Sequence, residues 1–337
     1  MRKAIVLCIA LCACGPDKPA ANETPTATAS ATVASPPSAQ VAQPSSPDTA
    51  RGLAAVQSGD WATAKSAFEA AIAKNARDAD AHHYLGVTLE QANDKTGAER
   101  EYKAALSIKP DLAEAAANLG AIYVEAQKWD EAIAVLKAAV QRRGDVAATH
   151  ENLALALTGK GDQQGAARAF DNALKITPTD AMLLYTYGHT LATWNQPDAA
   201  IAKLKAARDA AGAQAELLGS IGHELLLLRA VPDCIATFDK AIAAKDGAQF
   251  RTERALCKLS GKDEAGATAD LEAAVQQEPQ YGLAHYWLAT RRMNAKSWRE
   301  AAKELEAYLK LEPNGPHAKT AQDALAVAKN GGKQKPH

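Results

Sequence analysis

Histidine and cysteine are the residues of this chain whose side chains could ligate a metal or act as nucleophiles. The sequence of 337 residues contains 8 histidines and 5 cysteines. They do not form the short-spaced sets that hold zinc, and the sequence carries neither a glycine-rich phosphate loop nor a nucleophilic serine motif. We therefore expect a protein without catalysis, metal or cofactor.

The composition is typical of closely packed helices. Apolar residues make up 47% of the chain and aromatic residues 5%, so alanine supplies much of the apolar share. Alanine has the highest helix propensity and lets helix backbones approach one another. The 38 basic and 39 acidic residues nearly cancel, so nucleic-acid binding is not expected. No run reaches the roughly 18 apolar residues that a transmembrane helix needs.

The first residues, MRKAIVLCIALCAC, have the order of an export signal, with two basic residues before an apolar run. The usual A-x-A cleavage pattern is absent. Leu11 to Cys14 instead resembles the bacterial lipoprotein signal, in which the cysteine is acylated and becomes the new N-terminus. The resemblance implies a signal peptide over residues 1–13, a lipid on Cys14 and an extracytoplasmic protein anchored in the cell envelope. Gly15 replaces the aspartate that retains some of these lipoproteins at the inner membrane, which favours the outer membrane or periplasm. A plain secretory signal is the alternative.

Residues 14–47 are rich in Pro, Ala, Ser and Thr and lack a helical period. Seven of the 15 prolines lie between Pro16 and Pro47. Such a segment buries too little apolar surface to offset the entropy of ordering it. We expect a disordered tether that spaces the globular part from the membrane.

A period of 34 residues begins after residue 45. Small residues recur at three positions of this period and a large apolar residue recurs at a fourth. Gly52, Gly86 and Gly120 illustrate the first position, and Phe68, Tyr102 and Leu136 illustrate the last. This pattern resembles the tetratricopeptide repeat, a pair of antiparallel helices whose small residues let the axes approach while the large residue fills the gap. The resemblance implies an all-α, right-handed superhelical solenoid of about eight helix-turn-helix repeats with a C-terminal capping helix.

The period also predicts the boundaries of the solenoid, over residues 48–315. The repeats are expected near 45–78, 79–112, 113–146, 147–180, 181–214, 215–247, 248–281 and 282–315. A capping helix should follow over residues 316–330, and residues 331–337 should form a disordered tail. Arg51 stands where a core leucine is expected, so the first helix should fray. Tyr308 replaces a small residue in the last repeat, as at the end of a stack.

The repeat register assigns roles to the histidines and cysteines. His82, His150 and His285 share position 4, where the family often has a buried tryptophan, so we expect them to pack. Cys234 begins the second helix of repeat six and Cys257 lies late in the first helix of repeat seven. These helices run antiparallel, which brings the two cysteines to a similar height and favours a disulfide in an oxidising compartment. The alternative is that Cys234 merely serves as the small residue of its position.

In this family, ligands lie against the first helices of the repeats, which predicts a concave groove here. At the groove positions, repeats two to four carry acidic residues without lysine or arginine, and repeats five to eight are more apolar. The predicted groove residues are Asp80, His83, Glu90, Glu114, Asn118, Glu125, Glu151, Asn152, Tyr185, His189, Glu216, His223 and Tyr286. Asn118 and Asn152 resemble the short asparagine ladder that holds an extended peptide in some relatives. Charge complementarity then favours a partner with a basic segment.

The resemblance implies a non-catalytic scaffold of the bacterial envelope, similar to tetratricopeptide lipoproteins that help assembly or export. We expect a protein or peptide partner, membrane contact through the lipid and no nucleic acid. Two alternatives stay open. A polysaccharide or cell-wall binder would stack sugar rings on Tyr185, Tyr286 and Trp287. A self-associating module would use the apolar half of the groove as a homodimer interface.

Overall fold

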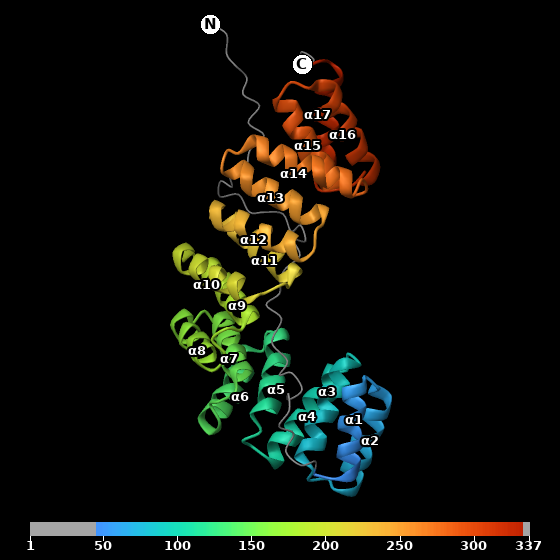
Figure 1. The fold of residues 1–337 in the computed structure, drawn as a ribbon. Helices are drawn as coiled ribbons and strands as arrows, with labels where there is room; N and C mark the ends of the chain where they lie inside the picture. The colour runs from blue at the N-terminus through green and yellow to red at the C-terminus, as the bar shows by residue number, and fades with distance from the viewer. Residues whose placement is uncertain (1–44, 333–337) are drawn as a thin grey trace. The chain divides into compact units, whose positions relative to one another are not determined.

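The computed structural model describes residues 45–332, which form 17 α-helices and no β-strand (Figure 1). The first nine helices are α1 (Pro47–Ser58), α2 (Trp61–Lys74), α3 (Ala79–Gln91), α4 (Lys95–Ile108), α5 (Ala113–Glu125), α6 (Trp129–Arg142), α7 (Ala147–Gly159), α8 (Gln163–Ile176) and α9 (Ala181–Thr193). The other eight are α10 (Pro197–Ala210), α11 (Ala215–Leu227), α12 (Val231–Ala244), α13 (Ala248–Ser260), α14 (Glu264–Gln277), α15 (Gly282–Asn294), α16 (Trp298–Leu311) and α17 (Ala318–Lys329). The predicted signal peptide, Cys14, the tether up to residue 44 and the last five residues lie outside the described residues.

The described helices fall into two compact units. The N-terminal unit comprises α1–α9 and ends at residue 194, and the C-terminal unit starts at residue 195 and comprises α10–α17. In the N-terminal unit α1 packs on α2, α3 on α4, α5 on α6 and α7 on α8, and the C-terminal unit repeats this with α11 on α12, α13 on α14 and α15 on α16. Each second helix also packs on the next first helix, as α4 does on α5 and α14 on α15. The expected all-α repeat solenoid is confirmed.

Aspartate residues begin four of the second helices. Asp60, Asp94, Asp162 and Asp263 precede α2, α4, α8 and α14, and each carboxylate accepts a hydrogen bond from a backbone N–H three residues on, at 2.8–3.0 Å. Each bond satisfies a donor that the helix N-terminus would otherwise leave unpaired. The same N-terminal aspartate cap therefore starts the second helix in each of these four repeats.

A residue in the left-handed conformation ends the turn before each second helix. The φ angle lies between +56° and +81° at Gly59, Asn93, Gln127, Gly161, Asn195, Arg229, Lys262 and Lys296. Glycine and asparagine adopt this conformation readily, whereas other residues lose roughly 1–2 kcal/mol because Cβ approaches a backbone oxygen. Four of these turns therefore hold a strained glutamine, arginine or lysine.

The substitution Gln127→Gly is expected to raise the free energy of unfolding by about 0.5–1 kcal/mol. Glycine removes the left-handed strain, although it loses more backbone entropy on folding. Gln127 is exposed, so its side chain contributes little packing. The opposite change, Gly161→Ala at φ +81°, should lower the free energy of unfolding by about 1 kcal/mol. Urea unfolding followed by circular dichroism measures both, and a Gln127→Gly variant no more stable than wild type would argue against the strain.

The core of each helix pair is built from the repeated small and large residues. The large residue of every second helix is at most 1% exposed. These residues are Phe68, Tyr102, Leu136, Phe170, Leu204, Phe238, Leu271 and Leu305. A Cβ atom added to Gly222 of α11 would lie 2.6 Å from the Phe238 ring of α12, closer than such atoms approach in real proteins. The small residue is required because the two helices approach closely.

The first repeat differs from the expectation that its first helix frays. Helix α1 is continuous over Pro47–Ser58, so it includes the last residue expected in the tether. Thr49 is fully buried and its hydroxyl donates to the Asp78 carboxylate at 2.9 Å. Ser45 donates to the same carboxylate at 2.6 Å. Arg51 turns outward with 57% of its side chain exposed. The helix is therefore held by hydrogen bonds to Asp78 at the start of α3, and a core leucine is not needed.

Helix α17 packs on α16 at the C-terminal end. Tyr308 of α16, which replaces a small residue, is fully buried, and its hydroxyl accepts a hydrogen bond from the His317 backbone N–H at 3.0 Å. The His317 ring stacks on Tyr286 of α15 with ring centroids 4.2 Å apart. A residue too large for an internal repeat thus supports the segment that leads into α17.

Candidate functional site

The predicted groove residues of the N-terminal unit lie on the first helices α3, α5, α7 and α9. Asp80 begins α3 and is half-buried. Glu114, at the start of α5, pairs with Arg143 at 3.2 Å, and Glu125, at the end of α5, pairs with Lys95. Arg143 follows α6 and Lys95 begins α4, so both cations reach this face from outside the first helices. The face is therefore less acidic than the first-helix positions alone predict.

Glu90, near the end of α3, accepts a hydrogen bond from the Tyr102 hydroxyl. Burial raises the pKa of Glu90, the hydrogen bond from Tyr102 opposes that rise, and the negative charge of Glu125 adds to it. A carboxylate with a raised pKa is stabilised when a cation approaches. The Glu90 and Glu125 pair therefore favours an incoming basic side chain.

A chain of hydrogen bonds lies buried between α3, α4 and α5. The Asn118 Nδ2 atom lies 3.4 Å from His83 Nε2 and 3.3 Å from the Tyr102 hydroxyl oxygen. Burial lowers the pKa of His83 to about 4, so the ring is neutral near pH 7 and can accept from the Asn118 amide. Tyr102 was not among the predicted site residues. The sequence feature that could have identified it is a tyrosine, with its hydroxyl, at a core position where other repeats have Phe or Leu.

Glu151 and Asn152 of α7 are both buried, with 4% and 0% of their surface exposed. The Asn152 side-chain amide donates to the Ala117 carbonyl oxygen of α5 at 3.0 Å. The amide of Asn152 therefore joins two first helices. This differs from the expected ladder, in which the amide would hold the backbone of a bound peptide.

Tyr185 and His189 share one face of α9. Their ring centroids lie 6.3 Å apart with 28° between the ring planes, and both residues are half-buried. Met182, on the same helix, is 52% exposed. This part of the N-terminal unit is apolar and aromatic, in keeping with the composition expected for repeat five.

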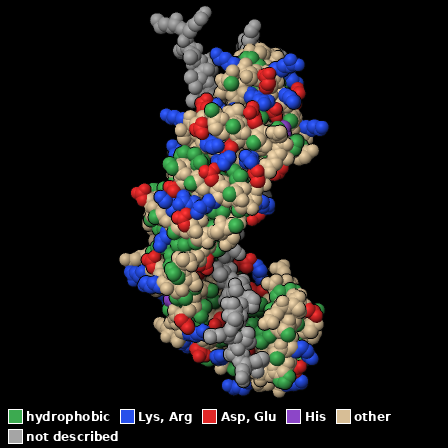
Figure 2. All heavy atoms as spheres, viewed as in Figure 1, with side chains coloured by type: hydrophobic (Ala, Val, Ile, Leu, Met, Phe, Trp, Pro, Cys, Tyr) green, Lys and Arg blue, Asp and Glu red, His purple; other side chains and the backbone are tan. Residues whose placement is uncertain are grey.

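On the C-terminal unit, the predicted residues of α11 are exposed and paired. Glu216 accepts from Lys245 at 2.7 Å, and His223 Nδ1 lies 3.4 Å from the Glu253 carboxylate. The hydrogen bond to Glu253 raises the pKa of His223. Leu227, at the end of the same helix, is 65% exposed. On the side of this unit that Figure 2 shows, acidic and basic side chains are intermingled.

The structure differs from the sequence expectation at Tyr286. Only 4% of Tyr286 is exposed, because the His317 ring covers it. Trp287 is half-buried and meets the Tyr286 ring edge-on at 5.3 Å between centroids. Tyr286 therefore belongs to the packing under the capping segment and offers no free ring face to a ligand.

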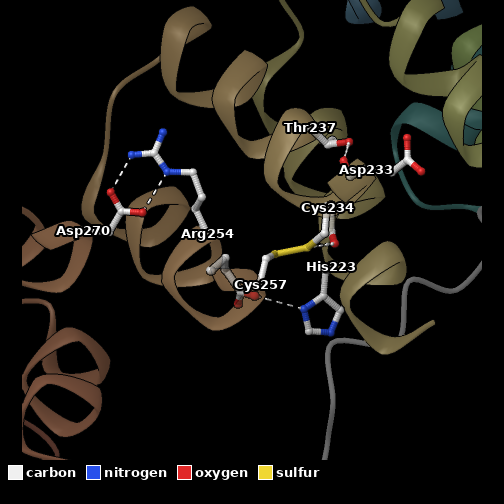
Figure 3. The surroundings of a disulfide bond; sticks show 9 residues. His223, Asp233, Cys234, Thr237, Arg254, Cys257 and Asp270 are labelled. Atoms are coloured by element: carbon white, nitrogen blue, oxygen red, sulfur yellow. Dashed lines mark hydrogen bonds and ion pairs between the residues drawn. A yellow bond between two sulfur atoms is a disulfide. The ribbon is translucent and has the colours of Figure 1, made fainter. Parts of the chain in front are cut away.

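Cys234 of α12 and Cys257 of α13 form a disulfide in the structure, with Cα atoms 6.0 Å apart (Figure 3). Both residues are fully buried. The bond ties a second helix to the first helix of the next pair and closes a loop with a sequence separation of 23 residues. Loops of this size gain roughly 3 kcal/mol of stability from a disulfide in the chain-entropy account.

Within residues 45–332, no group of three or more His, Cys, Asp or Glu side chains is placed to hold a metal ion. In the same range, no helix combines the length and the apolar character needed to cross a membrane.

The tetratricopeptide repeat family model matches residues 49–113 and 117–181. Among solved structures, yeast Tom70 is similar at a TM-score of 0.50 and 16% identity, over 88% of this chain and 66% of Tom70, slightly under two thirds of its length. MamA gives a TM-score of 0.43 and 20% identity over 49% of this chain and 96% of its own. A chain of the APC/C hetero-tetramer Cut9-Hcn1 gives a TM-score of 0.43 and 14% identity, over 80% of this chain and 52% of its own length. No curated protein matches the chain.

The family match and the architecture agree. The matched residues cover α1 to the start of α9, and the helix pairs of the C-terminal unit follow the same order of first and second helices. The likeness to Tom70, at 16% identity, concerns the fold alone. The chain is an all-α repeat solenoid that carries tetratricopeptide repeats.

Proposed function

We propose that this protein is a non-catalytic scaffold that binds a protein or peptide with a basic segment. Tetratricopeptide solenoids present extended surfaces on which partners lie. The observation that carries the proposal is the face of α3 and α5, where Glu90 is half-buried beside the charge of Glu125 and its pKa is raised. A lysine or arginine of a partner would pair with these carboxylates in competition with Lys95.

The proposal extends to the location of the protein. Residues 11–14 resemble a lipoprotein signal, so Cys14 would carry the lipid and hold the solenoid at the bacterial envelope, on the outer membrane or in the periplasm. Two or more acyl chains give stable anchoring, whereas one chain is marginal. The segment between Cys14 and the contacts of Ser45 would set the distance between membrane and solenoid.

The test is crosslinking and pull-down from the native membrane with two matched variants. The groove variant carries Glu114→Gln and Glu125→Gln on first helices. The control carries Glu69→Gln and Glu131→Gln, which remove the same charge from exposed sites on the second helices α2 and α6. We expect the groove variant to capture its partner about tenfold more weakly and with a flatter salt dependence, because surface charges contribute up to about 1 kcal/mol each.

Each other outcome has a definite meaning. Equal capture by wild type and groove variant would contradict a partner on the α3–α5 face. Equal loss in groove variant and control would show a general charge effect. Crosslinks only between copies of this chain would support self-association through an apolar surface such as Leu227. A Cys14→Ser variant should leave the membrane fraction, and its retention there would contradict the lipid anchor.

A further inference from the structure

His285 of α15 has an acceptor at each of its two ring nitrogens. Nδ1 lies 2.5 Å from Glu304 Oε2 of α16, and Nε2 lies 3.1 Å from the Pro279 carbonyl oxygen. A neutral imidazole has only one N–H, so it can donate to only one of two such oxygens. Both contacts are satisfied if the ring is an imidazolium beside a carboxylate, or if Glu304 itself carries the proton and donates to Nδ1.

Arg292 distinguishes these two arrangements. Its Nη1 atom lies 2.7 Å from Glu304 Oε1, the second oxygen of the same carboxyl group. A permanently charged guanidinium beside this group favours the carboxylate over the acid. Burial acts to raise the pKa of Glu304, but the hydrogen bond from His285 and the charge of Arg292 outweigh it, so the pKa is lowered. The proton therefore resides on the ring of His285.

The position of His285 makes it a link between successive helix pairs. Pro279 lies in the connection between α14 and α15, whereas Glu304 lies on α16. His285 is 6% exposed and Glu304 is 5% exposed, so water does not readily replace a lost contact. The other charged groups near the pair are Lys303 of α16 and, behind Arg292 at 3.7 Å, Glu272 of α14.

We propose that the His285–Glu304 pair is a pH-dependent lock that holds the last helix pair to the turn before it. The lock is closed when the ring carries its second proton and weakens when that proton is lost. Loss of the proton leaves either Glu304 Oε2 or the Pro279 carbonyl oxygen without its donor, while Arg292 still donates to Glu304 Oε1. Local acidity would thus tighten the end of the solenoid that supports α17.

Two other repeats share parts of this arrangement. His82 contacts Glu101 at 2.7 Å and the Ala76 carbonyl at 3.3 Å, the same two kinds of partner. His150 keeps the carbonyl contact, to Gly144 at 3.0 Å. Ala169 stands 19 residues after His150, at the position that Glu304 occupies after His285. His150 is therefore an internal reference without the carboxylate.

The sign of the pH dependence follows from the two partners. The hydrogen bond to Glu304 raises the pKa of His285 above 6.5, against the opposing effects of burial and Lys303. The contribution of His285 to stability is therefore complete below pH 6.5 and is lost as the pH rises through the pKa of the folded state. The pKa of Glu304 is lowered below 4.5, so its contribution is present above 4.5 and is lost as the pH falls through the folded value. The lock is strongest between about pH 4.5 and 6.5.

The test is an NMR titration of the imidazole rings in the full chain, with His285→Gln identifying the signal of His285. We expect His285 to titrate above 6.5 in wild type and at lower pH in a Glu304→Gln variant, while the signal of His150 is unchanged by that variant. Titration of His285 at or below 6.5 in wild type would overturn the proposal. The wild-type titration needs only the His285→Gln variant to fold, because that variant assigns the signal, so it decides the matter even where Glu304→Gln fails to fold.

A second measurement addresses the lock itself. Amide hydrogen exchange in α15 and α16, corrected for intrinsic rates, should lose protection severalfold between pH 6 and pH 8 in wild type. The Glu304→Gln variant, whose fold is checked by circular dichroism, should show no such change. Protection in wild type that is independent of pH would mean that the pair is static packing and would overturn the lock.

Discussion

Replacing Phe238 by alanine is expected to lower the free energy of unfolding of the C-terminal unit by about 3–5 kcal/mol. The ring of Phe238 is fully buried in α12 and lies directly against Gly222 of α11. The helices are fixed by the rest of their interface, so they cannot close over the space that the ring leaves. Because each helix pair contacts mainly its neighbours, hydrogen exchange in α11–α13 measures the effect locally, and urea unfolding measures the total.

The matched control is Phe238→Leu. Leucine is the natural residue at this position in α6 and α10, where Leu136 and Leu204 are fully buried. The leucine variant should therefore lose only about 1 kcal/mol, because most of the volume is kept. An alanine variant as stable as the leucine variant would show that packing of the large residue against the small one does not stabilise the α11–α12 interface.

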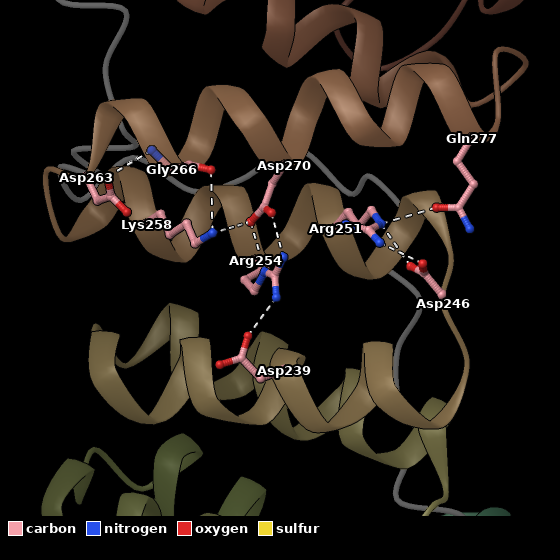
Figure 4. A network of polar contacts seen from close by, with 9 residues as sticks. All are labelled: Asp239, Asp246, Arg251, Arg254, Lys258, Asp263, Gly266, Asp270 and Gln277. Atoms are coloured by element: carbon pink, nitrogen blue, oxygen red, sulfur yellow. Dashed lines mark hydrogen bonds and ion pairs between the residues drawn. The ribbon is translucent and has the colours of Figure 1, made fainter.

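Replacing Asp270 by alanine is expected to lower the free energy of unfolding by about 3 kcal/mol, because it removes the buried partner of two cations. Arg254 then keeps only its contact with the exposed Asp239, at 2.7 Å. Arg254 of α13 holds the Asp270 carboxylate of α14 with two hydrogen bonds, at 2.5 and 2.9 Å, and Lys258 adds a contact at 2.8 Å (Figure 4). Only 6% of the Asp270 side chain is exposed. Chemical unfolding at pH 7 gives the size of the loss.

The control for Asp270 is Asp246, in the connection that leads into α13. Asp246 pairs with Arg251 at 2.6 Å, but 44% of its side chain is exposed, so Asp246→Ala should change stability by less than about 1 kcal/mol. Burial opposes ionisation of Asp270, yet Arg254 and Lys258 outweigh it and lower its pKa below 3.8. Its contribution is therefore present above pH 3.8 and is lost as the pH falls through the folded value. Equal losses for the two alanine variants would contradict the buried-pair account.

Much of the fold follows from the period of the sequence. Alanine and glycine at fixed positions and a large apolar residue at another require two helices that approach closely. The residues concerned are buried as that pattern predicts, Ala64 and Phe68 among them. The aspartate caps, for example Asp94 before α4, use contacts only three residues long. Such short-range signals can be read from sequence because the atoms that interact are close in the chain.

The candidate site could be predicted only in part. The sequence indicates which residues lie on the first helices, because that depends on the period. It did not indicate that Lys95 and Arg143 reach the acidic face, since these pairs join residues about 30 apart in the chain. Nor did it indicate that Tyr102, a core residue, donates to Glu90. Ion pairs between helices depend on side-chain reach and direction, which the period does not specify.

The sequence by itself determined the class of the fold, the helix pairs and the small and large residues between them, because these depend on local propensity and periodic burial. The tertiary structure decided which side chains are covered by others and in which protonation state the buried titratable side chains are held. Thr49 holds α1 through Asp78, which is 29 residues away in the chain, and His317 covers Tyr286 because the segment after the last repeat packs there. His285 gains a second acceptor because a turn and a neighbouring helix converge on its ring. Such convergence of distant groups exists only once the chain has folded.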